Sequence, residues 1–170
     1  MSITTIAISL AVLIAAGLMA WLLFFRKGYG DFIGVDHRQL KKFHKIELRG
    51  AFICNIAVGR EAQIEIEADS TVLPMILSVV EHGLLVVDTT QVKENIQVNI
   101  GAPELIQLDI NGACKVDLVE VNSDLLTVNI NGSAALLAKG ELRKGLLTIN
   151  GAGQIDGSAL KADEVEAVIN

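Results

Sequence analysis

The sequence is poor in aromatic residues, and those it has are unevenly placed. Only 4% of its 170 residues are aromatic, and all of the rings lie within the first 52 residues. Carbohydrate-processing β-helices use paired carboxylates together with aromatic platforms beneath the sugar. The rest of the chain has no such platform, so the composition argues against a polysaccharide lyase or hydrolase.

Residues that mark catalytic or metal sites are also scarce. The three histidines have no ligand spacing with one another or with Cys54 and Cys114, which excludes a recognisable zinc motif. There is no Gly-x-Ser-x-Gly sequence of the kind that presents a nucleophilic serine. We therefore predict no enzyme activity, no catalytic, cofactor-binding or metal-ligating residue, no cofactor and no small-molecule substrate. The two cysteines are expected to be small packing residues.

A long hydrophobic run without charge opens the chain. Residues 3–25 carry no charged side chain, and 23 helical residues span roughly 34 Å, enough to cross a bilayer core. Trp21 lies near the end of this run, and Arg26 and Lys27 follow it as head-group anchors. The sequence therefore predicts an uncleaved transmembrane helix over residues 1–27, with the lipid bilayer as partner.

Charge divides the remaining chain. Between Arg26 and Arg49 there are seven basic and three acidic residues, whereas seven basic and seventeen acidic residues follow from Gly50. Residues 28–42 are therefore predicted to be a basic juxtamembrane linker, and the acidic remainder is expected to repel nucleic acid. The positive-inside rule places the carboxy-terminal part of this single-pass membrane protein in the cytoplasm.

A phrase that recurs at a fixed interval is the most informative pattern. Asn-Gly pairs follow alternating aliphatic residues, and the asparagines are 20 and 19 residues apart, with Asn170 another 20 residues on. A period of 20 is typical of a solenoid. In such a solenoid, equivalent residues of successive coils form the turns and a ladder of stacked side chains. We expect these positions to be Asn111, Gly112, Asn131, Gly132, Asn150, Gly151 and Asn170.

Each unit is interpreted as strand, corner and strand. Aliphatic residues alternate with polar ones before each Asn-Gly, which then supplies the positive φ of a tight corner. Hairpins are the rival interpretation, because Asn-Gly also favours them. The near-identical units favour stacked coils, in which the asparagine amides would lie about 4.8 Å apart and hydrogen-bond along the stack. The predicted fold is all-β, a right-handed parallel β-helix or solenoid with about 20-residue coils over residues 43–170, preceded by the transmembrane α-helix.

Several segments of the sequence resemble the bacterial head-GIN domain, a family labelled as autotransporter adhesins. They are Phe43–Phe52, Ile66–Asp69, His82–Val87 and the three Asn-Gly units. The resemblance implies a right-handed single-stranded β-helix that is exported or membrane-anchored and has no established catalytic activity. It also implies an extracytoplasmic domain, against the charge rule. Family domains continue through more units, so the end at Asn170 is also what a truncated domain would show.

The leading functional hypothesis is a non-enzymatic, membrane-anchored β-solenoid in cell-envelope structure, adhesion or self-assembly. Self-assembly would be a homo-oligomer formed through the open C-terminal coil, because open strand edges template further strands. The alternative is an envelope sensing or ligand-binding module, and a carbohydrate-active enzyme ranks third.

Overall fold

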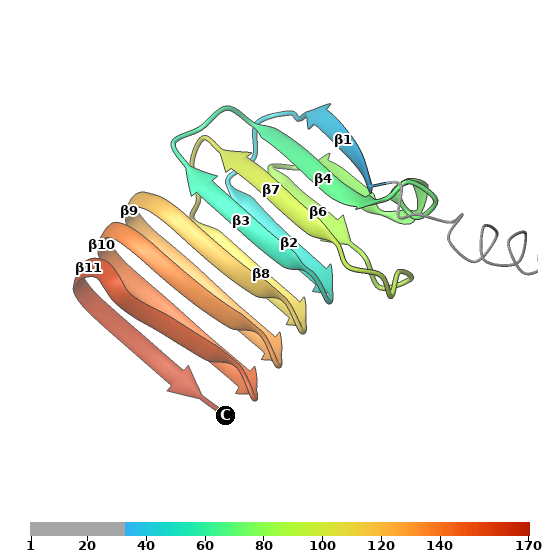
Figure 1. Ribbon diagram of the computed structural model, residues 1–170. Coiled ribbons are helices and arrows are strands. Elements are labelled where there is room, and N and C mark those ends of the chain that lie inside the picture. The colour runs from blue at the N-terminus through green and yellow to red at the C-terminus, as the bar shows by residue number, and fades with distance from the viewer. Residues whose placement is uncertain (1–32) are drawn as a thin grey trace, which may run out of the picture. The chain divides into compact units, whose positions relative to one another are not determined.

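The computed structural model describes residues 33–170, which form one curled sheet of eleven strands (Figure 1). One 3-10 turn, η1, interrupts them. In chain order the elements are β1 (Ile33–Gln39), β2 (Lys45–Gly50), β3 (Ile53–Val58), β4 (Gln63–Asp69), η1 (Leu73–Met75), β5 (Leu77–Glu81), β6 (Leu84–Asp88), β7 (Gln97–Ala102), β8 (Gln107–Gly112), β9 (Lys115–Gly132), β10 (Ala135–Gly151) and β11 (Gln154–Ile169).

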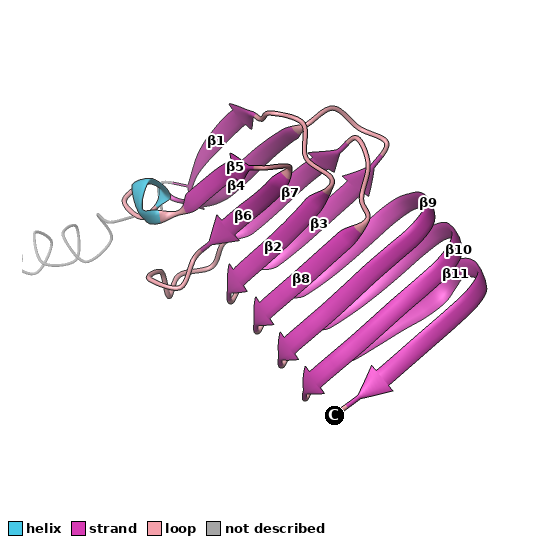
Figure 2. Ribbon diagram, turned by 180° about the vertical axis from the view of Figure 1, so that it is seen from behind, coloured by secondary structure: helices cyan, strands magenta, loops and turns pink. Residues whose placement is uncertain are grey.

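The sheet curls because its last three strands are long and bent (Figure 2). The first part of β9 pairs with β3, and its last part pairs with β8. The strands therefore form two walls. The first wall contains β1, β4, β7, β3 and the early parts of β9 to β11; the second contains β5, β6, β2, β8 and their late parts.

The core lies between the two walls. Strands of both walls alternate aliphatic and polar residues, so that one face of each is apolar. Ile46 and Leu48 from the second wall are fully buried, as are Cys54 and Ile56 from the first. Burying an aliphatic side chain of this size contributes about 1.5–3 kcal/mol. Small and medium aliphatic residues fill this interior, which explains why so few aromatic residues are needed.

Strands β8 to β11 are parallel and are in register at their Asn-Gly corners, with one register shift near Ala138 in the pairs that β10 forms with β9 and β11. Asn111 pairs with Asn131 and Asn131 with Asn150, each one repeat further along the chain. Gly132, which follows Asn131, has a φ of 130°, a conformation that side chains with a Cβ rarely adopt. The Asn-Gly pair thus ends one strand at a corner, and the next strand starts after two more residues.

The predicted uniform parallel β-helix of 20-residue coils is wrong. β1 with β4, β4 with β7, and β5 with β6 are antiparallel pairs, so the sheet is mixed. Tight reversals cause this difference. His82 and Gly83 have φ values of 49° and 79° and join β5 to β6 as a two-residue hairpin turn. Gly59, with a φ of 80°, begins the loop that turns the chain from β3 to β4. The regular repeat holds only from residue 107 onward.

Several predictions concern residues before Ile33. The transmembrane helix over residues 1–27, with Trp21, Arg26 and Lys27, lies outside the described residues. Within residues 33–170, no helix has the length and hydrophobicity needed to cross a membrane. Part of the predicted linker does lie within them: residues 33–39 form β1, which pairs with β4.

Candidate binding site

The predicted turn and ladder residues lie together along the second wall. Asn131 Nδ2 donates a hydrogen bond to Asn111 Oδ1 at 2.9 Å, and Asn150 Nδ2 donates to Asn131 Oδ1 at 2.8 Å. Asn170 Nδ2 extends the chain of bonds to Asn150 Oδ1 at 2.8 Å. Because each inner amide both donates and accepts, this asparagine ladder occupies its own polar groups and holds neighbouring strands in register.

The asparagine ladder begins on an ion pair. Asn111 Nδ2 donates to Glu47 Oε1 at 3.0 Å, and the Arg49 guanidinium donates to both oxygens of the same carboxylate at 2.8 and 3.0 Å. Arg49 occupies the register position of Asn111 on the neighbouring strand. The hydrogen bond and charge of Glu47 raise the pKa of Arg49. The carboxylate thus replaces an amide as the first acceptor of the stack.

Three glycines accompany the asparagine ladder. Gly112, Gly132 and Gly151 all have positive φ values, between 119° and 141°. A Cβ added at Gly151 would lie 2.7 Å from the carbonyl oxygen of Gly132, and the other two glycines face the preceding corner in the same way. Each corner therefore packs directly on the backbone of the corner before it.

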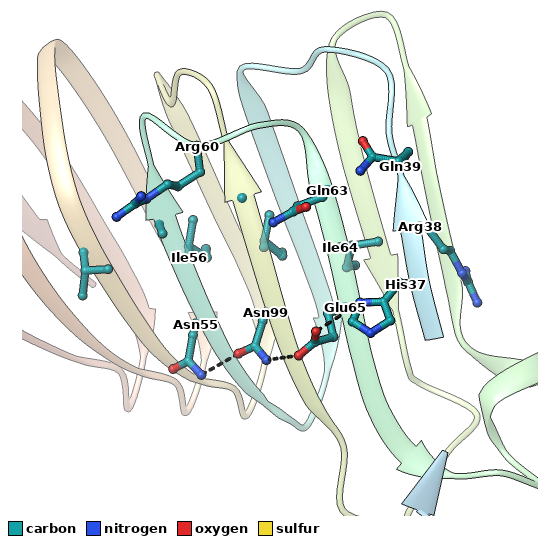
Figure 3. A pocket seen from close by; sticks show the side chains of 14 residues that line it. His37, Arg38, Gln39, Asn55, Ile56, Arg60, Gln63, Ile64, Glu65 and Asn99 are labelled. Atoms are coloured by element: carbon teal, nitrogen blue, oxygen red, sulfur yellow. Dashed lines mark hydrogen bonds and ion pairs between the residues drawn. The ribbon is translucent and has the colours of Figure 1, made fainter. Parts of the chain in front are cut away.

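A second row of polar side chains crosses the outer face of the first wall (Figure 3). Asn55 Nδ2 donates to Asn99 Oδ1 at 2.8 Å, and Asn99 Nδ2 donates to Glu65 Oε1 at 2.9 Å. His37 Nδ1 lies 3.1 Å from the other oxygen of Glu65. These four residues come from β3, β7, β4 and β1, which are neighbours in the sheet. We call them the amide row.

A hollow of about 420 Å³ lies beside the amide row. The adjacent register positions are Gln39, Gln63, Gly101, Ala57 and Val119. Gly101 and Ala57 are the smallest of these residues: Gly101 is buried beneath the backbone of Glu61, and the methyl group of Ala57 is half-buried beside it. Within residues 33–170, the side-chain amides of Gln39 and Gln63 have no hydrogen-bond partner, and they face this space (Figure 3). We call the hollow with its lining the groove.

The loop between β3 and β4 forms one rim of the groove. The amides of Gly59 and Arg60 donate to the carbonyl of Ala102 at 2.8 and 3.2 Å, which fixes the loop on the end of β7. A Cβ on Gly101 would collide with the backbone of Glu61, so a glycine there lets the loop fold close to the sheet. The loop in turn places Arg60 over the groove (Figure 3).

Charged groups around the groove are mostly neutralised within the protein. Arg60 forms a bidentate ion pair with Glu120 at 2.8 and 2.9 Å, and this hydrogen bond and charge raise the pKa of Arg60. Arg38 pairs with Asp36 and also donates to Ser78 Oγ at 2.7 Å, which links β1 to β5. A ligand therefore meets amides and paired charges, with no concentration of one sign.

Sequence reasoning missed the groove. Asn55, Glu65 and Asn99 occupy ordinary polar positions of alternating strands, and nothing in their spacing aligns them. The residues brought together are separated by 34 and 44 positions, because the chain reverses between them. Strand pairing, which the sequence does not fix in this region, is the only source of the arrangement.

The cysteines are not part of the candidate site. Cys54 and Cys114 are free and buried. Burial raises the pKa of Cys54 well above its usual value and that of Cys114 to about 11. Neutral thiols of this kind are poor nucleophiles.

Comparison with known proteins identifies a family. The family described as "Putative auto-transporter adhesin, head GIN domain" matches residues 42–170. No curated protein matches the chain.

Solved structures show the same fold at low sequence identity. A "putative adhesin" from Bacteroides fragilis has a TM-score of 0.66 and 16% identity, and the alignment covers 83% of this chain and 78% of that one. A "putative lipid binding protein" from Parabacteroides distasonis has a TM-score of 0.59 and 13% identity, with 84% and 80% covered. A "putative adhesin" from Parabacteroides merdae has a TM-score of 0.53 and 16% identity, with 84% and 79% covered.

Proposed function

The chain belongs to the family described as "Putative auto-transporter adhesin, head GIN domain", and from this premise we propose that it is a non-enzymatic adhesion module that binds through the outer face of its first wall. The groove is the single observation that carries the proposal. It combines a defined hollow with side-chain amides that the fold leaves without partners. The names of the structural relatives support an adhesive rather than a catalytic role.

Rigidity is the physical argument for placing binding on this face. The amide row lies on four neighbouring strands of the sheet and is held by hydrogen bonds between 2.8 and 2.9 Å. Groups that are ordered before binding lose little entropy when a ligand arrives. Hydrogen bonds between this face and a ligand would be weak at a single site. They give firm attachment when many copies of the protein bind one surface, because linked binding events reinforce one another.

The proposal is tested with beads that carry the purified full chain. Retention under flow is measured on surfaces coated with a glycoprotein, with a protein without glycans, or with phospholipid. We expect retention on one of these surfaces and its loss in the variant Asn99→Ala. The matched control is Asn129→Ala, because Asn129 also donates to a carboxylate, Asp109 Oδ1 at 2.7 Å, but on the second wall. Absence of retention on all surfaces, or equal retention by both variants, overturns the proposal.

Self-assembly is a second candidate function, supported by a separate observation. Within the described residues, β11 pairs with β10 along one side only, and its other side is a free edge. Val165 and Ile169 are 52% and 74% exposed there. A free strand edge beside exposed aliphatic side chains is a template for another strand, here one from a second copy.

Sedimentation velocity over a wide range of concentrations tests this second candidate. We expect the full chain to form oligomers that Val165→Lys and Ile169→Lys dissolve. Leu125→Lys is the control, since Leu125 is 42% exposed on β9, away from the free edge. A monomer at all concentrations, or oligomers that persist in both edge variants, contradicts assembly through β11.

A further inference from the structure

We propose that the groove binds a neutral saccharide, which makes this carbohydrate class the ligand of the adhesive face. The inference rests on the proposed adhesive function and adds to it the chemistry of the ligand. The volume of the groove, about 420 Å³, falls within the range of small-ligand pockets, which is roughly 300–1,000 Å³.

The hydrogen-bonding groups left over in the groove favour hydroxyl groups. Gln39 and Gln63 each offer an amide that both donates and accepts. Asn55 uses its Nδ2 to bind Asn99 and keeps its Oδ1 as an acceptor. Arg60 binds Glu120 through Nε and Nη2 and keeps Nη1 as a donor. Each sugar hydroxyl both donates and accepts hydrogen bonds, so sugars satisfy a mixed set of this kind better than a purely anionic or cationic ligand does.

The charge arrangement favours a ligand without net charge. Arg60 is neutralised by Glu120, whereas Glu65 accepts from Asn99 and lies against His37; the Arg38–Asp36 pair lies on the opposite face of β1. An anionic ligand would have to break the Arg60–Glu120 ion pair or approach the carboxylate of Glu65. A neutral ligand can form hydrogen bonds without disturbing them.

The part of the groove floor that lies outside the loop fits the apolar side of a sugar ring. Ala57 and Val119 give a shallow apolar surface there, whereas Gly101 is buried beneath the backbone of Glu61. No described residue of the groove is Phe, Tyr or Trp, so the sugar ring rests on small apolar groups. Binding at one site is therefore expected to be weak, roughly millimolar, and adhesion depends on many copies.

In the experiment, fluorescent beads that carry the full chain are applied to an array of neutral and acidic oligosaccharides, and the beads bound at each oligosaccharide are measured. We expect binding to neutral members such as maltohexaose or chitotriose. Titration with the soluble sugar should show a three- to tenfold weaker affinity in Asn99→Ala, because Asn99 is the positioning residue that holds the Asn55 amide in place. Gln63→Ala should weaken binding similarly, and it changes an exposed side chain that holds no other part of the fold. Asn129→Ala should bind as the unchanged chain does.

The outcomes separate the ligand class from the adhesive function. Retention that depends on the groove but persists with excess neutral sugar, or that occurs on glycan-free protein or phospholipid, overturns the saccharide while leaving adhesion in place. Preference for sialylated or sulfated members also overturns it. If retention on every surface is the same with and without the groove substitutions, both proposals are overturned together.

Discussion

The asparagine ladder gives the sharpest quantitative prediction, because one substitution removes two of its bonds. Asn131 donates to Asn111 at 2.9 Å and accepts from Asn150 at 2.8 Å. A hydrogen bond contributes about 0.5–1.5 kcal/mol net, and exposed bonds lie toward the lower end. Asn131→Ala should therefore lower the free energy of unfolding by about 1–2 kcal/mol. Asn170→Ala removes one bond and should cost about half as much.

Urea unfolding with linear extrapolation measures this difference. The matched control is Asn122→Ala, because Asn122 is exposed on the same strand and its side chain has no hydrogen-bond partner among residues 33–170. It should change the free energy of unfolding by less than about 0.5 kcal/mol. If Asn131→Ala and Asn122→Ala are equally stable, the side-chain stack contributes nothing and the register is held by backbone bonds and core packing alone.

Three further predictions concern the corners, the thiols and the response to acid. Gly132→Ala should cost about 2–3 kcal/mol in thermal or urea unfolding, because φ is 130° there, whereas Gly157→Ala meets nothing nearer than 3.9 Å and should be nearly neutral. Cys54 and Cys114 should react with a thiol reagent at pH 8 only after unfolding, since burial raises the pKa of both; labelling of the native chain would contradict this. The Thr90 hydroxyl lowers the pKa of Asp88, so this bond stabilises the fold above pH 3.8 and its contribution is lost as pH falls through the lowered pKa; Thr90→Val should be less stable by under about 1 kcal/mol at pH 7, and this difference should shrink as the solution is acidified through that pKa.

The repeated part of the fold was accessible from the sequence because its connections are short and equal. Each Asn-Gly pair is followed by two residues before the next strand, so units 19 or 20 residues long place like residues side by side. Alternating aliphatic residues then specify which face is buried. The positions of Asn111, Asn131 and Asn150 along the chain were therefore enough to indicate their neighbours in space.

The first half of the domain was not accessible in this way. Its strands use the same aliphatic alphabet, but the loop after Gly59 and the His82–Gly83 turn send the chain back on itself. β4 then pairs with β7 and β1 rather than with its chain neighbour β3. Between β4 and β5 the chain also forms the short turn η1, which has no counterpart in the repeat. Where the sequence has no repeat, the register of paired strands depends on packing between residues far apart in the chain. A single sequence does not show which residues pack together.

The two polar stacks show why binding is placed on one wall and stability on the other. In the asparagine ladder, each inner amide is satisfied by the amides above and below it, so it has little left to offer a ligand. In the groove, Gly101 is the register neighbour of Gln63 and has no side chain, so it leaves the Gln63 amide without a partner on that side. The same glycine admits the loop that carries Arg60. The glycine therefore gives the loop its place against the sheet and leaves beside it an unsatisfied amide, the group that recognition requires.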